Sequence, residues 1–340
     1  MNSSTGRKFK EVVFVYGRHG GGAIMSSIQP SYCLNKHGIR SYAVHSSDFL
    51  NTNSISKHKD SLIIFVRLPI NLGIWLNILR ENNNTLVCHL GDRDESAWHR
   101  ALETSSHLYD IYLTHGKHEH PKTRVIKHTY DLFLDHTSKK KQEFKILWCG
   151  NKCSSGKKSQ GEYGLSESGY KYDEKLFKPL EMYLSEFKKT KNSLDINSRV
   201  KNIIDNFHKE QKITEHIHAN NIDSYALHYC VRTPQLSDFS FLVKSSTKLS
   251  QAIGCESNII ISLGPPERAI IDESYRYSID TTTEEFSHNG EEICKEMIAR
   301  AQKEFNTKHW FDSLKYLSQF KKDLHPLSFG LQIVKYAEEL

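Results

Sequence analysis

Residues 11–45 read EVVFVYGRHGGGAIMSSIQPSYCLNKHGIRSYAVH. The stretch opens with a short apolar, β-branched run, Glu11–Tyr16, which predicts a buried strand. A glycine loop follows at Gly17–Gly22, and Ala23–His37 then carries apolar residues at helical spacing. Ile39–His45 predicts a second strand. Strand, glycine loop, helix and strand in this order are typical of the opening of a doubly wound α/β domain.

The same alternation of strands and helices continues along the chain. Strands are predicted at Ser61–Val66, Thr85–Leu90, Ile111–Thr114, Thr123–His128, Phe144–Gly150, Ser224–Val231 and Asn258–Leu263, and helices at Leu72–Arg80, Thr247–Ile253 and Glu291–Phe305. The lysine-rich stretch His136–Glu143 predicts a linker. We therefore expect two Rossmann-like, doubly wound α/β domains, residues 1–140 and 141–322, whose strand ends face a central cleft. Residues 323–340 predict a C-terminal helix.

The composition is that of an ordinary globular chain. Its 340 residues suggest about two domains, and the net charge of +6 permits a phosphate-bearing partner without requiring one. Its apolar stretches are too short to cross a bilayer, Met1–Lys10 lacks a signal-peptide pattern, and the seven cysteines are scattered. These features predict a cytoplasmic protein. The lysines at 139–141 and 188–191 would also suit peripheral contact with an anionic membrane.

The segment Val243–Leu263, VKSSTKLSQAIGCESNIIISL, is the most informative for function. It predicts a helix that starts among hydroxyl side chains and is flanked by lysines, followed by an apolar strand. The N–H groups and the positive dipole end of such a helix bind anions, and a diphosphate would fit. The alternative is an ordinary capped helix with solvated lysines. The candidate residues are Lys244, Ser245, Ser246, Thr247 and Lys248.

The pattern K-x-x-T-K-L over Lys244–Leu249, followed by an apolar strand, resembles the C-terminal domain of GT-B-type glycosyltransferases, with bacterial and viral polysaccharide-building members most similar. The resemblance implies that this segment holds the diphosphate of a nucleotide sugar, with UDP or GDP as the expected nucleotide. It also implies that Glu267, in GPPERAII, contacts ribose or sugar hydroxyls and that Arg232 assists. No metal or other cofactor is required in this family.

The N-terminal half carries the same resemblance. Gly20, Gly21 and Gly22 are similar to the glycine loop of the domain that binds the acceptor, although glycines there also serve a tight turn alone. The resemblance further implies that the helix over 323–340 returns to the N-terminal domain. Asp92, after the strand at Thr85–Leu90, and His19 are candidate catalytic bases, each with a structural alternative: a solvated helix cap and an ordinary loop histidine. The paired glutamates of retaining members are not clearly present, so the stereochemistry stays open.

A zinc site is one interpretation of the three histidines His115, His118 and His120. Their spacing, however, matches no closed zinc site, and no cysteine lies nearby in the sequence. A polar surface turn is the favoured interpretation.

The sequence therefore predicts a glycosyltransferase that moves a sugar from a nucleotide sugar to a hydroxyl of a glycan or lipid-linked acceptor. A sugar-nucleotide epimerase of the same architecture is the alternative within the enzymes. A basic nucleic-acid-binding module is the alternative from another class. It is not favoured, because the sequence lacks a concentrated basic stripe or a stacking platform for bases.

Overall fold

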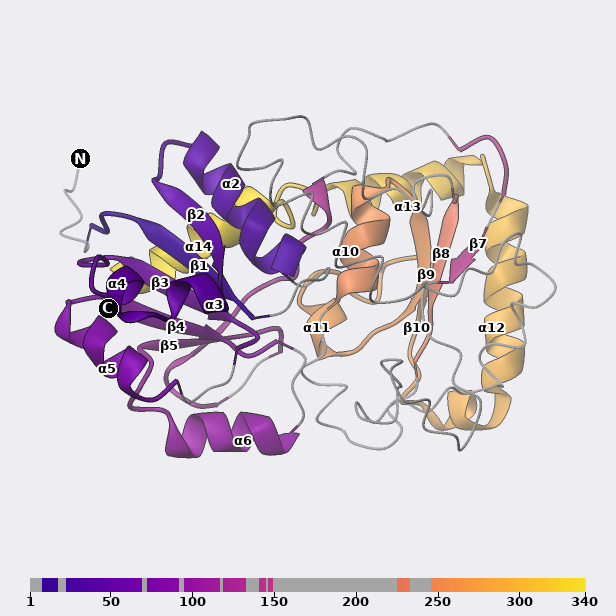
Figure 1. The fold of residues 1–340 in the computed structure, drawn as a ribbon. Coiled ribbons are helices and arrows are strands. Elements are labelled where there is room, and N and C mark those ends of the chain that lie inside the picture. The colour runs from indigo at the N-terminus through magenta and orange to yellow at the C-terminus, as the bar shows by residue number, and fades with distance from the viewer. Residues whose placement is uncertain are drawn as a thin grey trace.

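The structure, a computed structural model, describes residues 8–17, 23–68, 72–91, 95–116, 119–132, 141–144, 146–148, 225–232 and 246–340. Within these residues the chain forms two sheets with helices around them (Figure 1). Every strand pair in both sheets is parallel. The prediction of an α/β fold with parallel sheets is confirmed.

The first sheet has six strands in the order β2-β1-β3-β4-β5-β6. They are β1 (Val12–Tyr16), β2 (Ser41–His45), β3 (Leu62–Val66), β4 (Thr85–His89), β5 (Ile111–Thr114) and β6 (Thr123–Val125). The three central strands β1, β3 and β4 are buried along their whole length, which explains why they are continuous apolar runs in the sequence. Because β2 lies on one side of β1 and β3 on the other, the switch point of the sheet lies between β1 and β3.

The helices of the first sheet are η1 (Ile24–Ile28, a π-helix), α2 (Gln29–Lys36), α3 (Ser46–Phe49), α4 (Thr52–Ile55), α5 (Ile74–Glu81) and α6 (Glu95–Thr104). The helix predicted over 23–37 thus opens with a π-helical turn. The short helices α3 and α4 were not predicted. Each is a single turn started by a side chain of the preceding residue, His45 or Asn51, that accepts a backbone N–H.

The second sheet has the order β10-β9-β8-β7. Its strands are β7 (Ile146–Trp148), β8 (Leu227–Cys230), β9 (Asn258–Ser262) and β10 (Ser278–Ile279), and its helices are α10 (Thr247–Gly254), α11 (Pro265–Arg268), α12 (Glu284–Glu304) and α13 (Lys308–Ser318). Helix α12 starts seven residues before the predicted Glu291. The Thr283 hydroxyl accepts the Phe286 N–H at 3.1 Å and caps this earlier start.

The last helix, α14 (Pro326–Glu338), lies against the first sheet although it ends the chain (Figure 1). Phe329 and Ile333 enter the core that β1 and β3 form on one face of that sheet, and Tyr336 donates a hydrogen bond to the Val125 carbonyl at 2.9 Å. The two sheets are also linked directly. Ser250 of α10 donates to the carbonyl of His128, beyond β6, at 2.8 Å.

Gly330 sets the distance between α14 and α2, because a Cβ there would lie 2.7 Å from Cγ of the buried Leu34. We expect Gly330→Ala to lower the free energy of unfolding by about 1–3 kcal/mol through overpacking, despite the better helix propensity of alanine. Chemical denaturation measures this change. Lys335→Ala, on the exposed side of the same helix, is the control and should change stability by less than about 0.5 kcal/mol. A stabilised Gly330→Ala variant would contradict the close packing.

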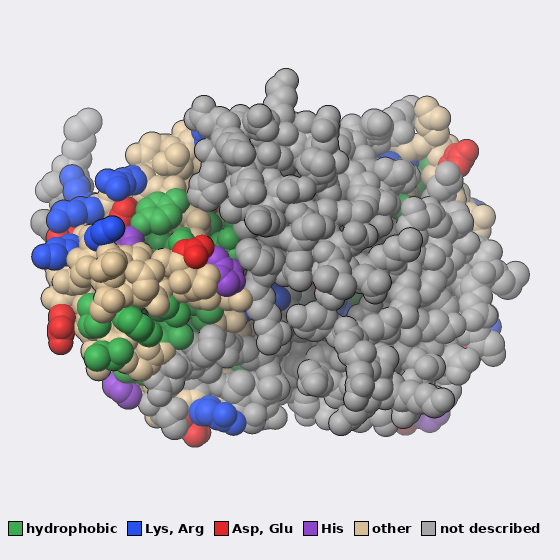
Figure 2. Space-filling model, viewed as in Figure 1, with side chains coloured by type: hydrophobic (Ala, Val, Ile, Leu, Met, Phe, Trp, Pro, Cys, Tyr) green, Lys and Arg blue, Asp and Glu red, His purple; other side chains and the backbone are tan. Residues whose placement is uncertain are grey.

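The end of the molecule around the first strand carries basic side chains beside acidic ones (Figure 2). Lys10 pairs with Asp60 at 2.7 Å, and Arg40 lies 3.4 Å from Glu11. These two basic residues are thus paired with carboxylates. None of the helices in the described ranges combines the length and the apolar character that crossing a membrane requires.

Candidate functional site

The carboxyl edge of the second sheet gathers the predicted donor residues that the structure describes. Arg232 follows β8, Glu267 follows β9, and the segment Ser246–Lys248 starts α10. Because α10 leads into β9 and packs beside β8 and β9, its first turn lies at the edge where these parallel strands end. Ligands of parallel α/β sheets bind at this edge. Residues far apart in sequence therefore lie along the same edge of the sheet.

The start of α10 has the features of an anion site. Ser246 is the N-cap residue, but its side chain makes no capping hydrogen bond to the first turn. Ser246 is buried, and its carbonyl accepts the Ser250 N–H at 3.0 Å, as in a regular helix. The first-turn N–H groups are therefore not occupied by their own cap, and Thr247 and Lys248 lie half-buried beside them.

Arg232 and Glu267 face each other at the same edge. The Arg232 N–H donates to the Ser262 hydroxyl at 2.9 Å, which ties the end of β8 to the end of β9. Its guanidinium Nη1 lies 4.0 Å from Oε1 of Glu267, and the two side chains are only 16% and 8% exposed. Glu267 stands in the single turn of α11, which two prolines start. A cation and a carboxylate are thus held together with little water around them.

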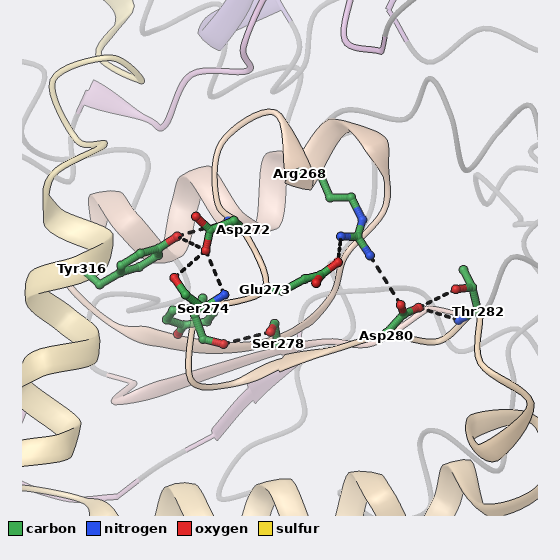
Figure 3. A network of polar contacts seen from close by, with 9 residues as sticks. Arg268, Asp272, Glu273, Ser274, Ser278, Asp280, Thr282 and Tyr316 are labelled. Atoms are coloured by element: carbon green, nitrogen blue, oxygen red, sulfur yellow. Dashed lines mark hydrogen bonds and ion pairs between the residues drawn. The ribbon is translucent and has the colours of Figure 1, made fainter.

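A network of polar contacts holds the segment that follows Glu267 (Figure 3). Arg268 bonds Glu273 and lies 3.5 Å from Asp280, and Asp280 accepts the N–H and hydroxyl of Thr282. These Thr282 hydrogen bonds, with Arg268 as a smaller contribution, hold the pKa of Asp280 below its ordinary value. Its carboxylate therefore stabilises the fold at neutral pH and loses that effect as pH falls through the lowered pKa. The network positions α11 and is structural.

The remaining sequence predictions for the site stay predictions, because they lie outside the described residues. These are His19, Gly20, Gly21, Gly22, Asp92, Lys244 and Ser245.

Arg67 is a residue of the first sheet's carboxyl edge that the sequence did not single out. It follows β3 beside the switch point, its side chain is exposed, and its φ of 55° is left-handed. Its side chain passes over Gly91, where a Cβ would lie 3.1 Å from Nε of Arg67. The one sequence signal near Arg67 was Gly91, directly after the predicted strand Thr85–Leu90. In the structure Gly91 has a left-handed φ of 63°, which glycine adopts readily. The carboxyl edge of the first sheet thus carries the Arg67 guanidinium, on a residue whose backbone is left-handed.

Three buried histidines lie at the same edge: His89, His115 and His128. The Nε2 atoms of His89 and His115 are 3.2 Å apart, and Nδ1 of His115 lies 3.0 Å from the Ile126 carbonyl. A carbonyl only accepts, so neutral His115 carries its proton on Nδ1 and accepts from His89 at Nε2. The prediction of a polar surface turn is therefore wrong for His115. This residue directly follows β5, next to the edge strand β6, and is buried by its neighbours.

Within the described ranges, no group of three or more His, Cys, Asp or Glu side chains has an arrangement that holds a metal ion. His118 lies outside these ranges, and the ring of His120 accepts the Lys122 N–H at 3.2 Å.

Comparison with solved structures shows what this fold is similar to. A glycosyltransferase from Rickettsia africae ESF-5 superposes with a TM-score of 0.54 at 10% identity, over 97% of this chain and 99% of that chain. HepE of Anabaena, solved in complex with UDP-glucose, superposes with a TM-score of 0.53 at 10% identity, over 97% and 100% of the two chains. No protein-family model matches the sequence, and no curated protein matches it.

The chain therefore has the fold of these two glycosyltransferases over nearly its whole length. The resemblance expected from the sequence is confirmed at the level of the fold.

Proposed function

We propose that this chain is a cytoplasmic glycosyltransferase that takes a sugar from a nucleotide sugar and attaches it to a hydroxyl of a glycan or lipid-linked acceptor. One observation carries the proposal. The start of α10 and the Arg232–Glu267 pair share one edge of a parallel sheet. HepE of Anabaena, which has a similar fold, was solved in complex with UDP-glucose. Because a fold alone does not define an activity, the proposal depends on the charged and hydrogen-bonding groups at this edge.

The donor's diphosphate would bind at the first turn of α10. The N–H groups there point toward a bound anion, and the helix dipole favours negative charge. Lys248 adds a full positive charge, and Thr247 adds a hydroxyl donor. Lys244, Ser245 and Ser246 complete the proposed set. As the bond between the sugar and the diphosphate breaks, negative charge grows on the leaving oxygen, and donors already in position stabilise it.

Arg232 and Glu267 would divide the rest of the donor between them. Without a donor, the guanidinium faces the carboxylate at 4.0 Å. With a donor, Arg232 contacts the diphosphate as a further cation. Glu267 accepts hydrogen bonds from ribose or sugar hydroxyls, because an ionised carboxylate can only accept.

The acceptor would bind at the carboxyl edge of the first sheet, across the cleft of a two-domain GT-B arrangement. We assign residues 1–140 to the acceptor domain, 141–322 to the donor domain and 323–340 to a helix that returns to the first. Gly20, Gly21 and Gly22 would line the cleft. The acceptor oxygen attacks the anomeric carbon of the sugar, Asp92 or His19 takes its proton, and the nucleoside diphosphate departs with the bonding electrons. The proposal includes no metal and no further cofactor.

Thermal unfolding with UDP, GDP, CMP, ADP and dTDP, each with and without Mn²⁺, tests the donor site. We expect one diphosphate, UDP or GDP, to stabilise the native state without metal, by about 2.7 kcal/mol at 100 times its dissociation constant. A response that needs Mn²⁺ would contradict the metal-free site. No response to any nucleotide, with DNA or RNA binding that falls steeply with salt, would overturn the proposal in favour of a nucleic-acid-binding module.

A further inference from the structure

A cavity of about 420 Å³ lies at the other end of the second sheet, between the end of α10 and helix α13. Trp310, Phe311 and Leu314 form its apolar wall, and Lys141 and Lys315 bring positive charge. Glu256 also lines it. The volume falls within the usual range of small-molecule sites, which is about 300–1,000 Å³.

The cavity is separate from the proposed donor site. Helix α10 begins at the donor edge with Thr247, and Ile253, at its other end, lines the cavity. Eight helical residues span about 12 Å. A nucleoside diphosphate at the start of α10 would therefore not reach this cavity.

The apolar wall of the cavity reaches solvent. Trp310 is 2% exposed and belongs to the core, but the next residue, Phe311, is 47% exposed. Only two other large hydrophobic side chains are that exposed among the described residues, Ile74 and Leu340. An exposed aromatic ring beside an open cavity favours an apolar group as part of the ligand.

The charges of the cavity favour an anion as the other part. The carboxylate of Glu256 is paired with Lys321 at 3.0 Å, so the acidic group of the wall is neutralised. Lys315 lies on the same helix as Phe311, and none of the ion pairs among the described residues includes it. A lysine next to an apolar wall covers that wall with its stem and keeps its charge at the water boundary.

We propose that this cavity binds an anionic phospholipid of a membrane surface. One acyl chain would lie against Phe311 and Leu314, and the head group would lie near Lys315 and Lys141. Phe311 and Lys315, on the exposed side of α13, would thus touch the membrane surface, while Trp310 and Leu317 stay in the core. The proposal does not depend on the transferase activity, because none of its residues belongs to the donor edge.

Sedimentation with lipid vesicles tests this site. We expect the protein to bind vesicles of phosphatidylcholine with 30% phosphatidylglycerol, and much less to vesicles of phosphatidylcholine alone. Lys315→Glu changes two charges, each worth about fivefold at an anionic surface, so binding should weaken about 30-fold. Phe311→Ser should weaken it about tenfold. The matched controls are Lys335→Glu and Ile74→Ser, an exposed lysine and an exposed apolar residue elsewhere, and they should bind like the original protein.

Two further readouts make the outcome decisive. Inorganic phosphate and the soluble dihexanoyl phosphatidylglycerol are titrated in parallel, and only the lipid should bind; binding of phosphate alone would overturn the proposal. Equal vesicle binding by all four variants, or none by the original protein, would overturn it as well. The nucleotide responses of Lys315→Glu and Phe311→Ser should be unchanged, so this proposal and the proposed function fail separately.

Discussion

Lys248→Ala should weaken binding of the responding nucleoside diphosphate by about 10- to 100-fold. This is the value of one charge-assisted hydrogen bond of about 1.5–3 kcal/mol. Lys248 is the second residue of α10, beside first-turn N–H groups that the side chain of the N-cap residue Ser246 does not cap. Its half-buried position lets it approach a bound phosphate. Isothermal titration calorimetry with the diphosphate measures the loss. The nucleoside monophosphate should lose less, because it presents fewer phosphate oxygens to the same turn.

Lys308→Ala is the matched control. Lys308 is the first residue of α13, whose N-cap Thr307 also makes no capping hydrogen bond, so it reproduces a lysine at an uncapped helix start. Its removal should leave nucleotide affinity unchanged. If Lys248→Ala and Lys308→Ala bind the diphosphate equally well, the start of α10 is not the donor site, even if the nucleotide binds.

Arg232→Gln and Glu267→Gln should affect binding of different parts of the donor. Arg232→Gln is expected to weaken the free diphosphate and the nucleotide sugar alike, by about 10- to 100-fold, because it removes a cation from the phosphates. Glu267→Gln is expected to weaken the nucleotide sugar about tenfold or more and to leave the free diphosphate nearly unchanged if Glu267 holds the sugar. Both titrations use the same variants, so each serves as the control for the other. An equal loss of both ligands in Glu267→Gln would assign the carboxylate to the ribose or to the positioning of Arg232.

The free energy of unfolding of the same variants, without nucleotide, measures how strongly Arg232 and Glu267 interact in the folded protein. Arg232→Gln leaves the Glu267 carboxylate, 8% exposed, without its guanidinium neighbour and should cost about 1–2 kcal/mol of unfolding free energy. The double variant should recover part of that cost, because the buried negative charge is then gone. Additive losses would show that the two side chains do not interact in the folded protein.

Much of the fold was predictable because its decisive signals are local. The runs at β1, β3 and β9 are buried on both faces, and each is continuous and apolar in the sequence. The start of α10 was predicted to the residue from its hydroxyl and lysine side chains. The two-residue strand β10 and the single turns α3 and α4 were missed. Such short elements lack a period that a sequence pattern can carry.

The sequence by itself determined the alternation of strands and helices, the parallel sheets that this alternation requires, and the candidate donor residues on three separate segments. Each follows from a periodicity or a residue type within a short window. Only the tertiary structure decided that Arg232 faces Glu267, that His115 is buried against His89 rather than exposed in a turn, and that Arg67 lies over Gly91. The residues in these pairs stand 24 to 35 positions apart in the chain. They meet because neighbouring parallel strands end at the same edge of a sheet, a proximity that no local pattern encodes.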